Sequence, residues 1–207
     1  MNISVVVPAL NESENIGRCL DSLLAQTRQA DEIIVVDNGS EDDTAEIALS
    51  YGVKVLSFPR PDVKFGDIGL VRQKGVEEAN GDIIISADAD IIYPREHIEK
   101  IEKIYAADPY LVLLGGPVFS SVRNVVNDLL DGVYNFHRSY WTGWGIPLFF
   151  GANMSFRRGA FLKTDGYRGA AAHGPVEELI VGFRLSRVGN FMWCDDVYCY
   201  SQRVLLA

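Results

Sequence analysis

Short apolar runs and amphipathic segments alternate along the first half of the chain, and this alternation constrains the fold more than any other feature of the sequence. Runs rich in Val and Ile predict buried strands at 3–9, 32–37, 53–58 and 81–90, and helical spacing of apolar residues predicts helices at 11–27, 39–52, 69–80 and 93–108. Strands that alternate with helices form right-handed crossovers and so build a mostly parallel central sheet flanked by helices. The predicted fold class is therefore α/β.

The regular alternation of predicted strands and helices ends at about residue 115. Helices are predicted at 121–141 and 175–189, a stretch rich in glycine and aromatic residues lies between them, and one or two strands are predicted in 191–207. No internal repeat, low-complexity segment or linker separates the two parts. We therefore predict one domain over residues 1–207, with functional halves of about 1–115 and 116–207.

The composition excludes several classes of protein. Hydrophobic residues make up 48% of the chain, which is enough for a sizeable core. The net charge of -9 argues against nucleic acid as a partner, because nucleic-acid binders present a basic surface. No signal peptide is evident, and no apolar run approaches the roughly 18 to 20 residues of a spanning helix. The cysteines Cys19, Cys194 and Cys199 lack zinc-type spacing, so we expect reduced thiols and a cytoplasmic location.

Polar residues gather where the predicted strands end. In doubly wound sheets, ligands bind beyond the carboxyl ends of the strands. The residues that fall at these ends are Asn11, Glu12, Asp37, Asn38, Asp88 and Asp90. This coincidence predicts a binding site at one rim of the sheet.

Two of these acids, Asp88 and Asp90, follow a buried strand directly and are one residue apart. Buried charge is costly unless it is paired or binds a metal. Hard divalent cations such as Mg²⁺ or Mn²⁺ prefer oxygen ligands and often share them with substrate phosphates. A solvated turn with two acids is the alternative for a motif this short.

Five segments together resemble the family-2 glycosyltransferases. The segments are 5–12, 35–44, 80–90, 151–167 and 176–189, and they occur in the order and spacing of that family from residue 3 to about 190. The resemblance implies the GT-A fold. It also implies an enzyme that moves a sugar, with inversion, from a UDP- or GDP-linked donor to a hydroxyl or phosphate of a carbohydrate or lipid-linked acceptor.

The resemblance also assigns residues to the donor. The residues expected to contact the nucleotide sugar are Pro8, Ala9, Asn11, Glu12, Asp37, Ser40, Arg72, Asp88, Ala89 and Asn153. Within this set, Asp37 is expected to contact the nucleobase, and Asn153 the sugar or phosphate. Arg72 is expected near phosphate or near the loop of Asp88 and Asp90, here called the acidic loop. For Asn11 and Ser40, helix capping is the alternative role.

The metal and the catalytic base follow from the same resemblance. Asp90 is expected to bind Mn²⁺ or Mg²⁺ directly, and Asp88 to contact the ribose or the metal through water. Glu178 takes the position of the general base, with Glu177 beside it, seven residues before Arg184 and Leu185 at the expected offset. Alternatively, both glutamates only favour a helix N-terminus. No histidine lies where some relatives carry a third metal ligand, so we expect the metal to bind together with the nucleotide.

The aromatic residues of the second half point to the acceptor. Trp141, Trp144, Phe149 and Phe150 are candidates for an acceptor groove, a lipid-facing surface or core packing. A peripheral contact with the cytoplasmic membrane face is therefore one expectation. No acceptor motif of the processive polysaccharide synthases is present, so we expect non-processive transfer.

Two other functions are compatible with parts of the sequence. Residues 83–90 also resemble the opening strand of haloacid-dehalogenase-like phosphatases, with Asp195 and Asp196 as a second acidic pair. That reading leaves the other four segments unexplained. A non-catalytic nucleotide-sugar-binding module is the second alternative. A Rossmann dehydrogenase is excluded, because the first strand is not followed by G-x-G-x-x-G.

Overall fold

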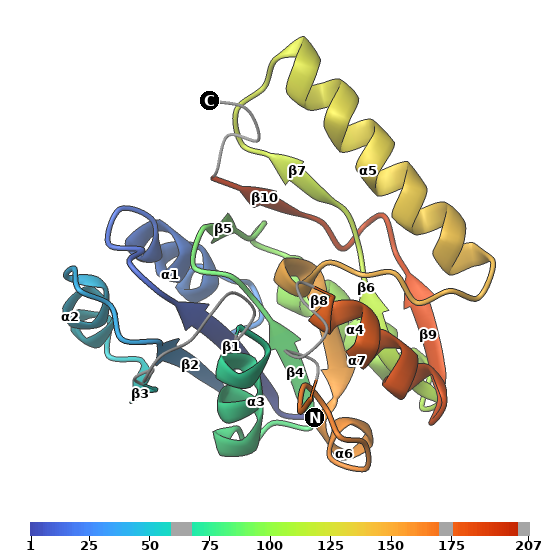
Figure 1. Cartoon of the computed structure of the whole chain (residues 1–207), viewed down its shortest axis with the longest axis horizontal. Helices are drawn as coiled ribbons and strands as arrows, with labels where there is room; N and C mark the ends of the chain where they lie inside the picture. Colours follow the sequence, from blue (N-terminus) through green and yellow to red (C-terminus); the bar gives the residue numbers. More distant parts are fainter. Residues whose placement is uncertain (59–67, 170–175, 203–207) are drawn as a thin grey trace.

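A seven-stranded sheet forms the centre of the computed structural model, which describes residues 1–58, 68–169 and 176–202 (Figure 1). In spatial order its strands are β3 (Lys54–Ser57), β2 (Glu32–Asp37), β1 (Ile3–Ala9), β4 (Ile83–Ser86), β8 (Met154–Arg157), β6 (Leu111–Gly115) and β9 (Asn190–Trp193). Every neighbouring pair is parallel except the two that β8 makes. The predicted mostly parallel α/β sheet is confirmed.

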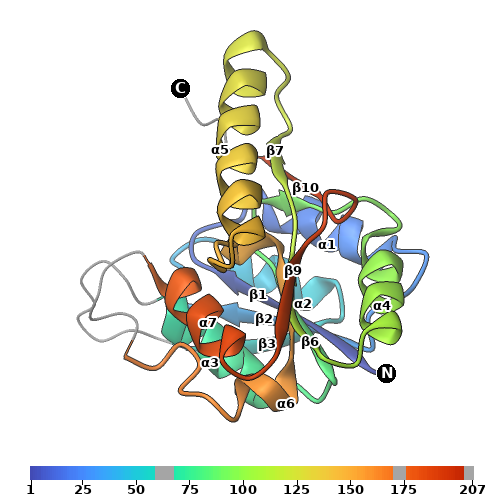
Figure 2. The ribbon, with the colours of Figure 1, turned by 90° about the vertical axis from the view of Figure 1, so that its right-hand side faces the viewer.

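Helices cover both faces of this sheet (Figure 2). One face carries α1 (Ile16–Leu24), α2 (Thr44–Ser50) and α4 (His97–Ala107), and the other carries α3 (Ile68–Glu78), α6 (Arg158–Phe161) and α7 (Glu177–Ser186). Each set of helices closes a separate hydrophobic cluster over the sheet. The site at the rim therefore rests on a sheet that is held from both sides.

Strand β1 explains why both faces can be apolar. Its side chains alternate, so Ile3, Val5 and Val7 enter the cluster under α1 while Val6 enters the cluster under α3. A strand buried on both faces reads as a continuous apolar run, which is typical of parallel sheets covered by helices. The remaining central strands follow the same pattern.

A second, three-stranded sheet lies beside the rim. It consists of β5 (Ile91–Ile92), β10 (Cys199–Ser201) and β7 (Val118–Ser120), with β10 in the middle. The backbone N–H of Gln202 donates to the carbonyl oxygen of Asp90 at 2.8 Å. The C-terminal part of the described chain thus packs directly against the acidic loop.

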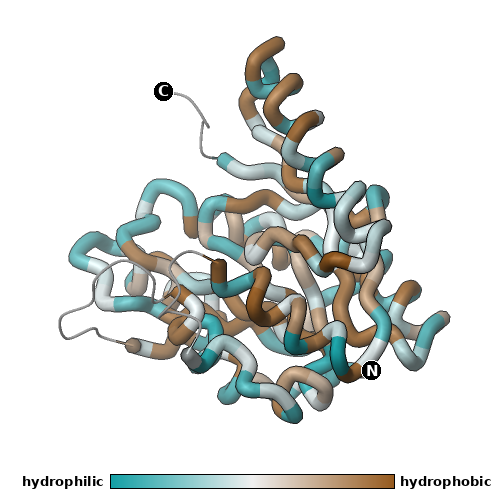
Figure 3. The backbone as a smooth tube through the Cα atoms, turned by 45° about the vertical axis from the view of Figure 1, so that its right-hand side comes forward, coloured by the Kyte–Doolittle hydropathy of each residue, from teal (hydrophilic) through white to brown (hydrophobic). Residues whose placement is uncertain are grey.

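Helix α5 (Val125–Gly143) stands out from the body and has its polar side inward (Figures 1 and 3). The buried side chains of Asn127, Asp131 and Asn135 bond to the backbone of 118–122. The apolar residues exposed on this helix include Val125, Val126, Leu129, Val133, Phe136, Tyr140 and Trp144. None of the helices in the described parts of the chain is long and apolar enough to span a bilayer.

Candidate active site

The loops that follow β1, β2 and β4 are bonded to one another at the carboxyl rim of the sheet. The N–H of Asn38 donates to the carbonyl oxygen of Ala9 at 2.9 Å, and the N–H of Ala87 donates to that of Val6 at 3.0 Å. These bonds continue the strand pairing past the strand ends. The predicted meeting of polar residues from separate strands is therefore present in the structure.

Asn11 and Ser40 join the first two loops instead of capping helices. The N–H of Asn11 donates to Oγ of Ser40 at 3.0 Å, and Oδ1 of Asn11 accepts from the N–H of Glu41 at 2.8 Å. Asn11 has φ 53°, in the left-handed region that Asn tolerates better than most residues. The capping alternative is wrong, because α1 begins at Ile16 and α2 at Thr44, beyond the reach of these side chains.

Asp37 ends β2 with a carboxylate that is held by its own loop. Its oxygens accept from the N–H of Gly39 at 3.3 Å and from Oγ of Ser40 at 2.5 Å. The side chain is buried. Its orientation is therefore set before any ligand arrives.

A cleft of about 410 Å³, here the rim cleft, opens between these loops. Its lining comprises Pro8, Ala9, Leu10, Glu12, Asn38, Ile68, Val71, Asp88, Ala89 and Asp90. Most of the residues predicted to contact a donor thus line one cleft or, like Asn11 and Asp37, lie in the loops that form it. Ile68 and Val71 were not predicted, because no sequence pattern shows which side of a helix faces a rim.

Arg72 is the strongest link between helix α3 and the acidic loop. Its Nη2 lies 2.5 Å from Oδ1 of Asp88, and its Nη1 donates to Oγ of Ser86 and to the carbonyl oxygen of Ala87. The arginine is almost fully buried. Although burial acts to lower the pKa of Arg72, the charges of Asp88 and Glu178 outweigh it, so the pKa is raised and the cation persists.

The two predicted glutamates open helix α7 and differ in their surroundings. Glu177 is buried, and its Oε2 has no hydrogen-bond partner among the described residues. Burial, followed by the charge of Glu178, raises the pKa of Glu177. Glu178 reaches the backbone of Gly151: a Cβ there would lie 2.6 Å from Oε1 of Glu178 and 2.9 Å from Nη2 of Arg72. A glycine is therefore what allows a carboxylate and a guanidinium to converge at this point.

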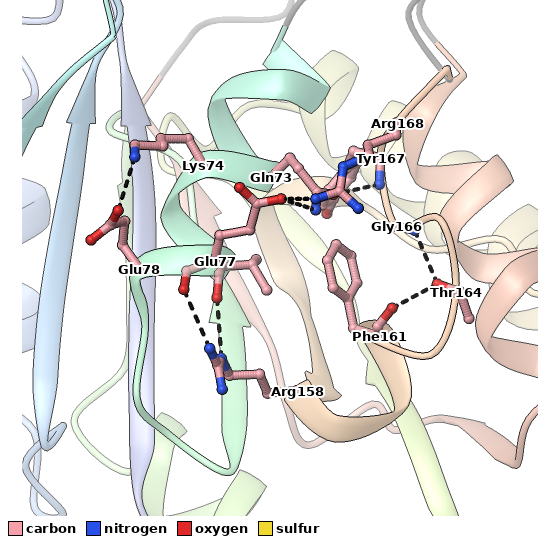
Figure 4. Close-up of polar contacts among 11 residues, drawn as sticks. Gln73, Lys74, Glu77, Glu78, Arg158, Phe161, Thr164, Gly166, Tyr167 and Arg168 are labelled. Carbon is pink, nitrogen blue, oxygen red and sulfur yellow. Dashed lines mark hydrogen bonds and ion pairs between the residues drawn. The ribbon is translucent and has the colours of Figure 1, made fainter.

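The segment 166–168 is hydrogen-bonded to both α3 and α7 and so connects these two helices. Oε1 of Gln73 accepts from the N–H of Tyr167 at 2.9 Å, and Nε2 of Gln73 donates to Glu77 at 2.8 Å (Figure 4). From the other side, Arg184 of α7 donates to two carbonyl oxygens in 166–168. The bonds of Gln73 and Arg184 thus help to set the distance between α3, which carries Arg72, and the start of α7.

Asn153 has a different role from the predicted contact with sugar or phosphate. Its Nδ2 donates to the carbonyl oxygens of Pro117 and Val197, each at 2.8 Å. The side chain is 1% exposed. Because both amide hydrogens are taken by buried carbonyls, this side chain joins the two sheets and has no donor left for a ligand.

The donor set at Asp88 and Asp90 fits a hard divalent cation, since it consists of carboxylate oxygens at the edge of an open cleft. Over residues 1–58, 68–169 and 176–202, no group of three or more His, Cys, Asp or Glu side chains could hold a metal. Two acids would therefore leave coordination positions for water or phosphate.

A second pocket of about 280 Å³, here the α5 pocket, meets the rim cleft at Asp88 and Asp90. Its lining comprises Asp88, Asp90, Ile91, Val118, Phe119, Ser120, Asp131, Tyr134, Arg138, Phe150, Ala152 and Ser201. Of the four predicted aromatics, Phe150 lines this pocket, Phe149 is in the core, and Trp141 and Trp144 are exposed. The sequence did not predict Arg138, because its inward position depends on how α5 packs.

Comparison with known proteins gives the family. The family model for glycosyl transferase family 2 matches residues 4–164. A relative, 4,4'-diaponeurosporenoate glycosyltransferase of Staphylococcus haemolyticus, is 30% identical over 197 residues, which are 90% of this chain and 51% of the relative. The chain belongs to glycosyltransferase family 2, as the five segments predicted.

A second relative and two solved structures extend this comparison. An undecaprenyl-phosphate 4-deoxy-4-formamido-L-arabinose transferase of Pectobacterium carotovorum is 36% identical over 118 residues, 54% of this chain and 36% of the relative. A mannosyltransferase from Pyrobaculum calidifontis in complex with GDP-Man and Mn²⁺ superposes with a TM-score of 0.77 at 20% identity, over 100% of this chain and 58% of that one. Glucosyl-3-phosphoglycerate synthase from Mycobacterium tuberculosis with Mn²⁺, UDP and its product gives 0.71 at 22% identity, over 99% and 73%.

These structures confirm the GT-A fold. The chain spans about half the length of the first of these relatives and about a third of the second.

Proposed function

We propose that the chain transfers a sugar, with inversion, from a UDP- or GDP-linked donor to an acceptor hydroxyl or phosphate, with Mn²⁺ or Mg²⁺. The observation that carries this proposal is the rim cleft, where Pro8, Ala9, Glu12 and the Asp88–Asp90 loop line one cavity beside the start of α7. The complexes of the structural neighbours with GDP-Man or UDP and Mn²⁺ support the choice of donor and ion.

The proposed donor site uses the rim residues in distinct roles. Pro8, Ala9, Asn11 and Glu12 border the nucleotide, and Asp37, oriented by Ser40, contacts its base. Asp90 holds the cation and Asp88, held by Arg72, contacts the ribose or a water of the ion. When bound, the divalent ion neutralises charge on the leaving diphosphate.

The proposed base is Glu178. Its carboxylate lies over Gly151, where Nη2 of Arg72, the ion-pair partner of Asp88, also approaches. A carboxylate there can take the proton of an attacking hydroxyl, which typically contributes about 10²- to 10⁴-fold to the rate. Glu177 is the alternative base, because its buried carboxyl has a raised pKa.

The acceptor is proposed to be a carbohydrate or a lipid-linked molecule. The relatives named for diaponeurosporenoate and undecaprenyl phosphate support the lipid-linked class. The exposed apolar side of α5 supports a peripheral contact with a membrane surface, which would present such an acceptor beside the α5 pocket.

A thermal-shift screen tests the donor and the ion. UDP, GDP and their sugars are added with and without Mn²⁺, and unfolding is followed by tryptophan fluorescence. A nucleotide at 100 times its dissociation constant should raise the free energy of unfolding by about 2.7 kcal/mol. No stabilisation by any of them beyond Mn²⁺ alone would refute the donor site, and binding without turnover on any acceptor would favour the non-catalytic module.

A further inference from the structure

The α5 pocket combines apolar walls with one half-buried cation. Val118 and Phe119 of β7, Tyr134 of α5 and Phe150 give it hydrophobic sides. Arg138 of α5 contributes the cation at the side that faces Glu178. A cavity with mostly apolar walls and a few oriented polar groups is typical of a binding site for a small molecule.

The guanidinium of Arg138 is oriented but not neutralised by the protein. Its Nη1 donates to the carbonyl oxygen of Phe149 at 2.5 Å, and its Cζ lies 3.9 Å from the centre of the Phe150 ring. No carboxylate of the described residues forms an ion pair with it. Burial lowers the pKa of Arg138, and the charge of Glu178 opposes this only in part.

Three other arginines of the described chain each make an ion pair or more hydrogen bonds within the protein than Arg138 does. Arg72 bonds to Asp88, to a hydroxyl and to a carbonyl, and Arg157 donates to three carbonyl oxygens. Arg123, near the start of α5, pairs with Asp128. An arginine has five N–H donors, so Arg138 retains donors for a partner outside the protein.

Three acids, Asp88, Asp90 and Asp131, also line the α5 pocket, and no ion pair joins any of them to Arg138 in the described part of the chain. Oδ2 of Asp131 accepts from the N–H of Ser120 at 2.8 Å, so that this carboxylate is turned to β7. Asp88 and Asp90 lie at the border with the rim cleft, where the proposed divalent ion would offset their charge. The positive charge of Arg138 is thus left facing the pocket.

We propose that the α5 pocket binds an amphiphilic acceptor, with an anionic group at Arg138 and an apolar part along Val118, Phe119 and Tyr134. This inference rests on the proposed function and narrows its acceptor class. A planar guanidinium stacked on an aromatic ring binds phosphate or carboxylate oxygens in a fixed orientation. The acceptor then lies in the pocket that meets the rim cleft at Asp88 and Asp90, on the same side of the sheet as the proposed donor.

The test uses the full chain, saturated with Mn²⁺ and the nucleotide diphosphate that the thermal-shift screen selects, and calorimetry with three probes. Octyl phosphate carries both features, 1-octanol only the chain, and inorganic phosphate only the charge. Octyl phosphate should bind at least about tenfold more tightly than either of the others, because a charge-assisted hydrogen bond is lost with the alcohol and apolar burial with the free ion.

Variants locate the effect at Arg138. Arg138→Gln should weaken the binding of octyl phosphate about tenfold without changing that of octanol, and Arg138→Lys should recover part of the loss. Arg123→Gln, just before the start of the same helix, should change neither affinity. Equal affinity of wild type and Arg138→Gln for octyl phosphate would overturn the inference, and so would equal affinity of wild type for octyl phosphate and octanol. Free phosphate bound as tightly as octyl phosphate would overturn its apolar part.

The same samples separate this inference from the proposed function. Binding of Mn²⁺ and nucleotide diphosphate is measured first, in the absence of the probes. If the wild type binds no nucleotide, the proposed function fails. If it binds nucleotide but selects octyl phosphate independently of Arg138, the function stands and the inference alone fails.

Discussion

Nη2 of Arg72 lies 2.5 Å from Oδ1 of Asp88, so a cation from helix α3 holds one acid of the rim in place. The same guanidinium donates to Oγ of Ser86 and to the carbonyl oxygen of Ala87, so it bonds to the last residue of β4 and to the residue that follows it. The arginine is 2% exposed and the aspartate 27%. The position of Asp88 in the acidic loop is thus set in part by one buried side chain of another element.

Replacing this arginine should destabilise the fold. Arg72→Met removes a buried ion-pair partner of Asp88 and one donor each from the hydroxyl of Ser86 and the carbonyl of Ala87, so the free energy of unfolding should fall by roughly 3–5 kcal/mol in urea denaturation. Lys74→Met is the matched control on the exposed side of α3 and should have no measurable effect. A loss below about 1 kcal/mol for Arg72→Met would show that the pair does not stabilise the rim.

Glu178→Gln should lower turnover without lowering donor affinity. The amide keeps the size of the side chain but cannot accept the proton, so kcat should fall about 10²- to 10⁴-fold in an assay of nucleotide diphosphate release. Glu177→Gln should have a smaller effect if Glu178 is the base. Near-normal kcat for Glu178→Gln together with a large loss for Glu177→Gln would transfer the role to Glu177.

Gly151→Ala should impair activity more than stability. The new Cβ would displace the end of the Glu178 side chain, which is flexible enough to move without unfolding the chain. It would also crowd Nη2 of Arg72, which its bonds to Asp88, Ser86 and Ala87 hold in place. Gly132→Ala, in the interior of α5 with nothing within 4 Å of its Cβ, should instead stabilise by about 0.5–1 kcal/mol. We expect kcat to fall at least about tenfold for Gly151→Ala alone, since small displacements of catalytic groups are costly. Unchanged kcat would mean that the convergence over Gly151 is not catalytic.

Asn153→Ala tests whether the side chain of Asn153 contacts a ligand or only stabilises the fold through its two hydrogen bonds. Loss of both Nδ2 donors leaves the carbonyl oxygen of Val197 unsatisfied and that of Pro117 with only the N–H of Cys199, so the free energy of unfolding should fall by about 1–3 kcal/mol. Affinity for Mn²⁺ and nucleotide diphosphate, measured well below the unfolding temperature, should stay within about twofold. Unchanged stability with a large loss of nucleotide affinity would restore the sequence-based prediction.

The elements predicted best are those that form a long periodic pattern of their own. Strand β1 and helix α4 lie where Val and Ile runs and helical spacing placed them, because burial on the sheet uses the same periodicity. Strands β5, β6, β7 and β8 were missed. Apart from the five-residue β6 they have four residues or fewer, and their pairing with strands distant in the chain makes them strands. The predictions for 203–207 lie outside the described residues, and the one-domain organisation and cytoplasmic location stay predictions.

The residues of the site also fall into two groups, those that a sequence pattern predicts and those that only the packing of the chain positions. Residues at the strand ends, such as Asp37 and Asp90, could be predicted because parallel topology brings all carboxyl ends to one rim. Asn153 and Arg138 could not be predicted. The first bonds to two carbonyls in the segments that precede β7 and β10, and the position of the second depends on α5 packing with its polar side toward the protein. Local sequence carries no signal for either arrangement.

The most direct measurement of the central claim is calorimetry of nucleotide diphosphate binding with and without Mn²⁺ for wild type, Asp90→Asn and Asp196→Asn. Asp196 is exposed after β9, so its variant is the matched control. We predict that Mn²⁺ strengthens the binding of nucleotide diphosphate to wild type and to Asp196→Asn at least about tenfold. Asp90→Asn should abolish this gain, because a neutral amide is a much weaker ligand for a hard cation. An equal gain from Mn²⁺ in Asp90→Asn would contradict the account, since the acidic loop would then not be where the ion and the diphosphate meet.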